Sequence, residues 1–301
     1  MENTREHGRA MVMMITAMLM LPGIDAIAKW LSGSISSGQV TWSRFFFQII
    51  LMSPLLLKTS GPWLNSALYL HAARGTLIAL ATLLFFSGLA YLPIADAISI
   101  FFIEPLLVTL LSAFFLGEAV GWRRLSAIVI GFVGAMVIIR PSFAEVGWAV
   151  LYPLGAALCF SVYIILTRKM VRSEDPIRLQ FFGGVFGFIV MSIALLFGTS
   201  QEIGMLTAVW PTQFEWMLLG TLGLVATAGH LFVVHAFRRA PVSVLAPFQY
   251  VEIIGATIFG LLIFDDFPDP ITWLGISIIV GSGVYVFHRE SRLEKQSSLS
   301  G

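Results

Sequence analysis

Ten apolar segments, each close to twenty residues long, constrain this chain more than any other feature. A helix of about 20 residues crosses the hydrocarbon core of a bilayer with its backbone hydrogen bonds satisfied internally. The composition agrees, since 57% of the residues are apolar and only 12% are charged, whereas about a quarter are charged in soluble proteins. The sequence therefore predicts an all-α membrane protein with ten transmembrane helices, at 10–31, 40–57, 74–91, 94–116, 123–140, 147–167, 178–197, 214–236, 242–264 and 271–288.

The basic residues are distributed unevenly over the connections between these segments. If the N-terminus lies in the cytoplasm, 15 of the 18 lysines and arginines fall on the cytoplasmic side. Loops on that side of membrane proteins carry an excess of Lys and Arg. Because the number of spans is even, we expect a multi-pass protein with both termini in the cytoplasm. No long basic run indicates nucleic-acid binding, and the one cysteine, Cys159, allows no intramolecular disulfide.

A shift of 148 residues aligns several of these segments with one another, and it places Glu104 on Glu252. The pattern predicts two five-helix repeats, 1–144 and 145–301, and a polar tail over 290–301 that we expect to be disordered. Because each repeat has an odd number of spans, the second must be inverted in the membrane relative to the first. Inverted repeats are typical of alternating-access carriers, whose binding site lies at the repeat interface near the middle of the membrane.

The two aligned glutamates lie deep within apolar segments. Glu104 is followed by Pro105, which removes one helical hydrogen bond and crowds the preceding turn. A carboxylate at this depth costs at least about 2.5 kcal/mol unless a partner, a proton or water compensates it. We therefore expect Glu104 and Glu252 to line a central cavity, where they bind a cationic group of the substrate or exchange a proton. The alternative is a permanently protonated carboxyl that binds a carbonyl group freed by a kink.

The first two spans each carry a polar pair with four-residue spacing. Asp25 and Lys29 have the spacing of an ion pair on one helical face, either in the site or as a structural pair near the outer interface. Arg44 and Gln48 have the same spacing in the second span. The Arg44 guanidinium could bind a carboxylate or phosphate through two hydrogen bonds. Alternatively, it anchors the helix among the outer headgroups beside Trp42.

Two polar residues precede Glu252 in the ninth span. Gln249 lies three residues before Glu252 and shares its helical face, so an amide and a carboxylate could hold one polar ligand. Tyr250 would project elsewhere, unless the helix unwinds beside Pro247. The alternative for this polar face is a set of hydrogen bonds between neighbouring helices.

The remaining candidates are a histidine and two aromatic rings. His230 lies deep enough in the eighth span to line a cavity, but its spacing from His235 does not match the i, i+4 histidine pair of a metal site. We therefore expect no metal and no cofactor. The rings of Phe101 and Phe248 could stack on a flat ring of a substrate.

Several of these motifs together resemble the EamA-like family of the drug/metabolite transporter superfamily. The residues that carry the resemblance are 90–97, Glu104-Pro105, Leu116-Gly117-Glu118, Gly131 and Gly134, and, in the second repeat, 240–243, Gly260, Gly275 and Gly281. The resemblance implies ten helices in two inverted halves, cytoplasmic termini and transport of a small organic metabolite across the inner membrane. Ile253 stands where the second copy often has proline, so the two halves could contribute unequally to a site.

The expected function is secondary transport of a small polar organic metabolite across the cell inner membrane by alternating access. The resemblance implies an amino acid or an amino-acid-like compound such as S-adenosylmethionine, or a vitamin such as riboflavin. The expected partners are this substrate, the lipid bilayer and protons. The alternatives are a passive facilitator or channel and a membrane-embedded enzyme acting on a lipid-linked substrate. No nucleotide-binding or hydrolase motif occurs in the sequence, so we expect no enzyme activity.

Overall fold

The described part of the chain is entirely helical, as the sequence predicts. The computed structural model describes residues 2–57, 59, 68–116, 122–170, 174–240 and 245–299. The α-helices are α1 (Glu2–Leu31), α2 (Ser37–Leu56), α3 (Leu68–Leu89), α4 (Ile94–Phe101), α5 (Glu104–Leu116), α6 (Trp122–Val146), α7 (Leu151–Met170), α8 (Pro176–Ser200), α9 (Gln213–Arg239), α11 (Val251–Phe264) and α12 (Pro270–Leu299). Three short 3₁₀ helices are η1 (Gly147–Val150), η2 (Gly204–Leu206) and η3 (Ala246–Tyr250).

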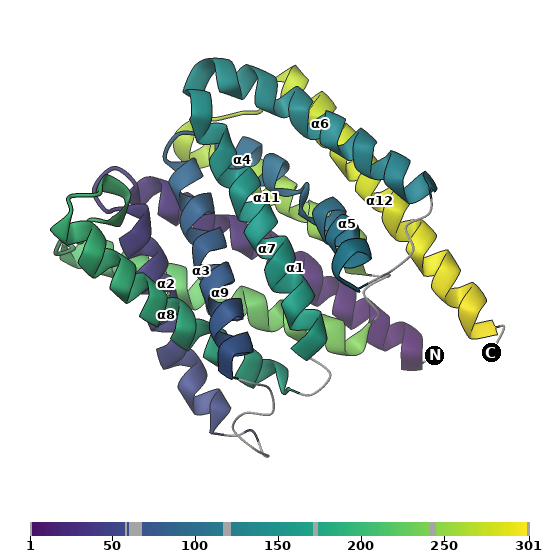
Figure 1. Cartoon of the computed structure of the whole chain (residues 1–301), viewed down its shortest axis with the longest axis horizontal. Coiled ribbons are helices and arrows are strands. Elements are labelled where there is room, and N and C mark those ends of the chain that lie inside the picture. The colour runs from purple at the N-terminus through teal and green to yellow at the C-terminus, as the bar shows by residue number, and fades with distance from the viewer. Residues whose placement is uncertain are drawn as a thin grey trace.

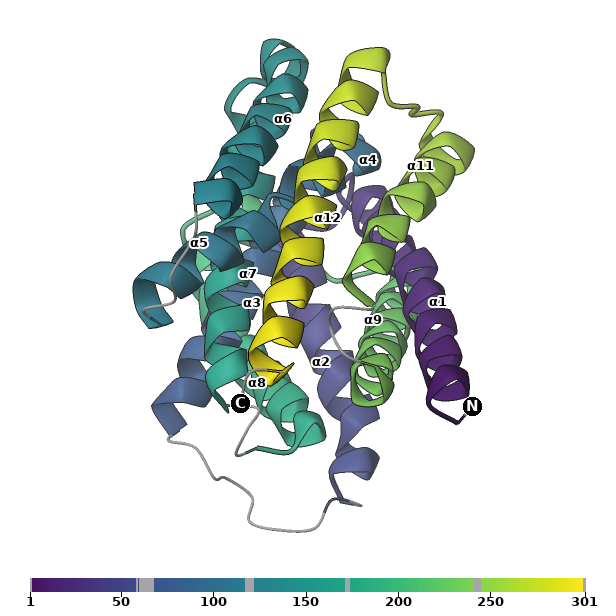
Figure 2. The ribbon, with the colours of Figure 1, turned by 90° about the vertical axis from the view of Figure 1, so that its right-hand side faces the viewer.

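The helices correspond to the ten expected spans when α4 and α5 are taken as one interrupted span. Within the described residues, six spans are long and apolar enough to cross a membrane, and three shorter apolar helices accompany them. Figure 1 shows the helices gathered into one bundle. Both termini lie at the same end of this bundle in Figure 2, as an even number of spans requires.

Local sequence signals explain where several helices begin and end. The Ser36 hydroxyl caps the N-terminus of α2, and the Asp175 carboxylate caps α8. Thr212 and Glu215 form a reciprocal capping box at the start of α9. These side chains satisfy N–H groups that have no partner in the first helical turn. Asp265, with a left-handed φ of 58°, ends α11.

The fourth and ninth spans are both irregular next to their glutamate. The fourth is interrupted at 102–103, directly before Glu104. Pro105 explains this interruption, because it has no N–H to donate and its ring crowds the carbonyl of Phe101. In the ninth span, the 3₁₀ helix η3 precedes α11, and Glu252 is the second residue of α11.

Two expectations about connections are wrong. Pro141 was expected in the connection between the fifth and sixth spans, but α6 continues through it to Val146. A helix can retain a proline at the cost of one hydrogen bond. The polar tail was expected to be disordered, whereas α12 remains helical as far as Leu299. Its Glu, Arg, Lys and Gln residues are good helix formers, so the segment continues the helix beyond the apolar part.

The helices pack in pairs that repeat when the two halves are exchanged. Helix α1 packs on α9 and α11, and its counterpart α7 packs on α3 and α5. Likewise α3 packs on α8, and α9 packs on α2. Three contacts join equivalent helices of the two halves, namely α2 with α8, α6 with α12 and α4 with α11. Two inverted repeats around a central axis predict this pattern.

Glycines allow the closest helix contacts between the halves. A Cβ atom at Gly75 of α3 would overlap the Cβ of Phe186 on α8 and lie 3.1 Å from the backbone nitrogen of Gly187. A Cβ atom at Gly131 of α6 would overlap Leu106 and lie 2.7 Å from the hydroxyl of Ser282 on α12. Small residues at such crossings let helix backbones approach where lipid supplies no hydrophobic drive.

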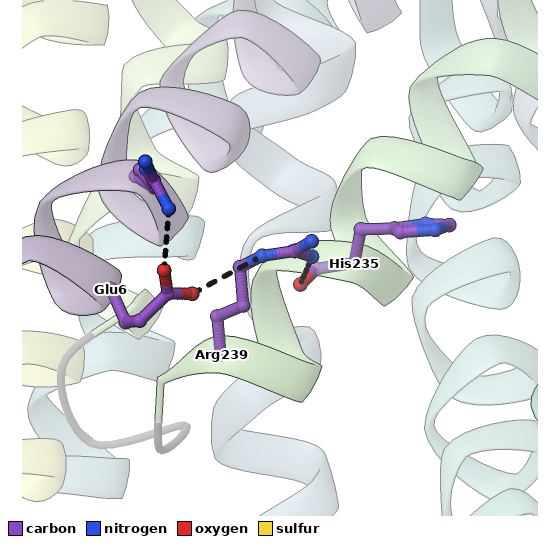
Figure 3. A network of polar contacts seen from close by, with 4 residues as sticks. Glu6, His235 and Arg239 are labelled. Atoms are coloured by element: carbon purple, nitrogen blue, oxygen red, sulfur yellow. Dashed lines mark hydrogen bonds and ion pairs between the residues drawn. The ribbon is translucent and has the colours of Figure 1, made fainter. Parts of the chain in front are cut away.

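A polar network joins α1 to α9 at the end of the bundle that holds the termini. The Glu6 carboxylate lies 2.7 Å from Nη1 of Arg9 and 3.5 Å from Nε of Arg239. Arg239 also donates to the backbone carbonyl of His235, and Figure 3 shows the His235 ring directed away from Glu6. The first helix of one half is thereby tied to the third helix of the other.

Candidate substrate-binding site

Arg44 is a buried arginine in the first half of α2. Its side chain is 8% exposed, its Nη1 donates to the Thr82 hydroxyl on α3, and its Cζ lies 5.4 Å from the centre of the Phe45 ring. Among the described residues, its buried Nε has no hydrogen-bond partner. The interpretation of Arg44 as a headgroup anchor is therefore wrong. A buried N–H without an acceptor is costly, so this position suits a ligand or a water molecule.

A small cavity lies next to Arg44, between helices of both halves. Its lining includes Gln48, Tyr163, Gln180 and His230. The Gln48 amide donates to the Gln180 carbonyl at 2.9 Å, which holds α2 against α8. The cavity volume is about 10 Å³, which is room for about one water molecule. Small-molecule pockets typically have about 300–1,000 Å³, so a metabolite fits here only after the helices separate.

Asp25 of α1 belongs to the same buried group. Its side chain is 7% exposed, and its carboxyl interacts electrostatically with Arg44 and with Glu252 on α11. The expected ion pair with Lys29 is wrong, because Lys29 Nζ instead lies 2.6 Å from Asp266 in the second half. Lys29 lies one turn nearer the end of α1, where it can reach the connection after α11. Asp25, deeper in the bundle, meets the arginine.

Glu104 lies where the fourth span meets the ninth. Its carboxyl interacts electrostatically with the Tyr250 hydroxyl, and its backbone carbonyl accepts a hydrogen bond of 3.3 Å from Ser161 on α7. The Phe102 ring packs edge-on against Tyr250, with centres 5.3 Å apart. Beside Pro247 the chain forms the 3₁₀ helix η3, which is wound more tightly than an α-helix, and Tyr250 contacts Phe102 of the first half.

The other sequence candidates lie at different distances from the cavity. Phe101 contacts Phe160, with ring centres 5.5 Å apart, and Phe160 contacts Tyr163 at 5.3 Å. Phe101 is thereby connected to the cavity lining. Phe248 packs instead against an apolar cluster formed by α1 and α9, and it does not line the cavity. Gln249 is half-buried in η3.

Arg74 forms a buried network that the sequence did not reveal. It is 2% exposed, and it donates to the hydroxyls of Thr167 and Tyr163 at 2.8 and 2.7 Å and to the Leu179 carbonyl. Tyr163 therefore connects this network to the cavity beside Arg44. Arg74 is the first residue of the expected span 74–91 and was counted among the basic residues on the cytoplasmic side. Helix α3 begins six residues earlier, at Leu68, which places Arg74 well inside the bundle.

These observations define a class of protein. Apolar helices form one bundle, and polar side chains from both halves, with the buried Arg44 among them, line a small cavity. Charged residues that face the interior of a membrane bundle mark substrate or ion pathways. The fold and the site are those of a membrane transport protein.

The chain belongs to the EamA-like transporter family, whose profile matches residues 8–140 and again residues 147–287. It is 30% identical to the S-adenosylmethionine uptake transporter of Rickettsia conorii over 277 residues, which are 89% of this chain and 88% of that protein. It is 26% identical to the riboflavin transporter of Rhizobium johnstonii over 303 residues, covering 97% and 96% of the two chains. The pseudopaline exporter of Pseudomonas aeruginosa is 25% identical, with 85% and 88% covered.

The fold also occurs in a solved structure. A protein of known crystal structure that is 20% identical superposes on this chain with a TM-score of 0.62, covering 95% of this chain and 98% of its own. At this identity the likeness concerns the fold alone.

Proposed function

We propose that this protein is a secondary transporter for a small zwitterionic metabolite that carries an amino-acid group, with S-adenosylmethionine as the first candidate. The cell inner membrane is the proposed location, with both termini in the cytoplasm, because most of the basic residues in the connections and near the chain ends then lie on the cytoplasmic side. The proposed units are the two inverted repeats 1–144 and 145–301, whose interface holds the site.

The observation that carries this proposal is the unpaired Nε of the buried Arg44 guanidinium, near the buried carboxyl of Asp25. Arg44 suits a carboxylate, because a guanidinium can form two parallel hydrogen bonds with it. Asp25 interacts with Arg44 on one side and with Glu252 on the other. The carboxyls of Asp25 and Glu252 repel one another when both are ionised, so a bound cation relieves this cost. An α-amino acid group supplies an anion and a cation at short separation.

The relatives support the same choice of substrate. S-adenosylmethionine has a carboxylate, an ammonium group and a sulfonium group, and the proteins named as its uptake transporters are up to 30% identical to this chain. Riboflavin is the second candidate, because named riboflavin transporters are also related. It has neither a carboxylate nor an ammonium group, and it would depend on the rings of Phe101, Phe160 and Tyr163.

Alternating access is the proposed mechanism, rather than passive flow through a channel. The cavity beside Arg44 is far too small for a metabolite, so substrate entry requires the halves to move apart. Contacts join the halves at both ends of the bundle, through Lys29 and Asp266 at one end and Glu6 and Arg239 at the other. In an alternating cycle each set breaks while the opposite set holds.

Counterflow into proteoliposomes tests this function. Labelled S-adenosylmethionine should enter faster when unlabelled S-adenosylmethionine is trapped inside, because a carrier returns faster when loaded. Riboflavin preloading should give no such acceleration if the first candidate is right. Equal influx with and without trapped substrate would indicate a channel.

Competition by analogues tests how the site recognises the substrate. Decarboxylated S-adenosylmethionine, which lacks the group assigned to Arg44, should compete at least about 10-fold more weakly than the parent compound, since hydrogen bonds to charged groups contribute about 1.5–3 kcal/mol. Equal competition by both compounds would contradict the assignment of Arg44 to the carboxylate.

A further inference from the structure

A groove runs between α6 and α12, away from the site at Arg44. Its volume is about 380 Å³, and it is lined by Trp122, Ser126, Ala127, Ile130, Gly281, Ser282 and Tyr285. The two helices lie side by side in both views, along the upper right edge of the bundle in Figure 1 and facing the viewer in Figure 2. Trp122, Ile130 and Tyr285 are 72%, 53% and 48% exposed, so the groove opens outward from the bundle.

The shape and composition of the groove suit one flexible apolar chain. Small residues, Ala127, Gly281 and Ser282, leave the hollow, and the Ser126 and Ser282 hydroxyls donate to carbonyls of their own helices. Because these two hydroxyls already form hydrogen bonds, an apolar occupant of the groove does not leave their donors unpaired. The volume of 380 Å³ falls within the range of about 300–1,000 Å³ that single small ligands occupy.

The ends of the groove match the boundary between hydrocarbon and headgroups. Trp122 is the first residue of α6, whose N-terminal end is directed toward the side of the termini (Figure 2), and Tyr285 faces the same groove from α12. Trp and Tyr concentrate at membrane–water interfaces. In the sequence, Arg123 and Arg124 follow Trp122, and Arg289 and Arg292 follow Tyr285 in α12. Basic clusters between transmembrane helices on this side bind anionic headgroups.

We propose that α6 and α12 form a binding site for an anionic phospholipid from the leaflet on the side of the termini. One acyl chain occupies the groove, and the basic sequence at the ends of the two helices favours an anionic headgroup. A second copy of this chain fits the same surface poorly. A twofold contact through α6 and α12 would bring the basic helix ends of the two copies together, with like charges opposed.

Lipid binding counted by native mass spectrometry tests this site. The full-length protein in detergent is titrated with phosphatidylglycerol, which is anionic, and in parallel with phosphatidylethanolamine, which is zwitterionic. Gly281→Leu fills the groove, and no atom lies within 4 Å of a Cβ placed at Gly281, so the variant should fold normally. Gly8→Leu is the matched control, because Gly8 is also helical, exposed and free of atoms within 4 Å of an added Cβ.

The expected result is that Gly281→Leu weakens phosphatidylglycerol binding at least fivefold, whereas Gly8→Leu leaves it unchanged. The double substitution Arg123→Gln/Arg124→Gln should weaken binding of phosphatidylglycerol and not of phosphatidylethanolamine. Arg168→Gln/Lys169→Gln, which removes two charges from the end of α7, should leave both unchanged. Equal melting temperatures without added lipid show that the variants are folded.

Three outcomes would overturn the proposal. Unchanged phosphatidylglycerol binding by Gly281→Leu would exclude the groove, and equal affinity of the native protein for both lipids would exclude the headgroup site. A dimer that disappears in Gly281→Leu would show that a second copy occupies this surface.

Discussion

Lys29 of α1 and Asp266, beyond the end of α11, form an ion pair with 2.6 Å between Nζ and Oδ2 that joins the two halves of the chain. Lys29 also donates to the Leu92 carbonyl at 3.0 Å and lies 5.0 Å over the Phe264 ring. The side chains are 17% and 31% exposed, so solvent screens this pair only in part. The pair connects residues that are 237 positions apart in the sequence, and it holds the two halves together at the end of the bundle opposite the termini.

We expect Lys29 and Asp266 to be energetically coupled. Lys29→Gln and Asp266→Asn should each lower the melting temperature in detergent. The double variant should lose less stability than the sum of the losses of the two single variants. The coupling should be about 1 kcal/mol, at the upper end of values for exposed pairs. The exposed pair Arg9 and Glu6, with side chains 70% and 37% exposed, serves as control and should give less than about 0.5 kcal/mol. Additive single effects for Lys29 and Asp266 would contradict the prediction.

Arg44 should control substrate affinity. Arg44→Gln removes the guanidinium, and we expect binding of S-adenosylmethionine to weaken by about 10- to 100-fold, the equivalent of one or two charged hydrogen bonds. Arg44→Lys keeps the charge without the planar pair of donors, so its affinity for S-adenosylmethionine should lie between those of the native protein and Arg44→Gln. Isothermal titration in detergent measures the affinity, and Arg9→Gln is the control at an exposed arginine. Native affinity in Arg44→Gln would remove the proposed carboxylate contact.

Asp25 and Glu252 should determine how transport responds to pH. If one of them exchanges a proton during the cycle, Glu252→Gln or Asp25→Asn removes a titrating group, and uptake should become less dependent on pH. The measurement is the initial rate of uptake into proteoliposomes between pH 5.5 and 8.5, with Glu145→Gln, at an exposed position of α6, as control. A pH profile unchanged in both variants would show that the pair binds a cation without exchanging a proton.

Gly75 should be intolerant of the smallest substitution. Gly75→Ala places a methyl group against Phe186 and close to the backbone of Gly187, and backbone atoms cannot move aside as a flexible side chain can. We expect a loss of about 1–3 kcal/mol in the free energy of unfolding, typical of overpacking. Thermal unfolding in detergent measures it. Gly8→Ala, where an added Cβ meets no atom within 4 Å, should not destabilise, and equal stability of the two variants would contradict this packing.

Much of the architecture follows from patterns that are local in sequence. Apolar windows of about 20 residues predict spans because every backbone group must be satisfied within its own helix. The ends of the helices follow from caps such as Ser36 and Thr212. The break before Glu104 follows from the missing N–H of Pro105. The equivalence of Glu104 and Glu252 in the two repeats follows from the shift of 148 residues that aligns them.

The residues that contact the buried charges could not be predicted from local sequence patterns. Periodicity indicates which residues share a face of one helix, but not which helix that face meets. Lys29 therefore seemed to pair with Asp25, whereas the connection after α11 brings Asp266 to it. Arg44 and Arg74 resembled interfacial residues, because burial depends on the neighbouring helices that cover them. Which helices span the membrane is a property of each segment alone, while the charges that meet around Arg44 depend on how the two halves pack.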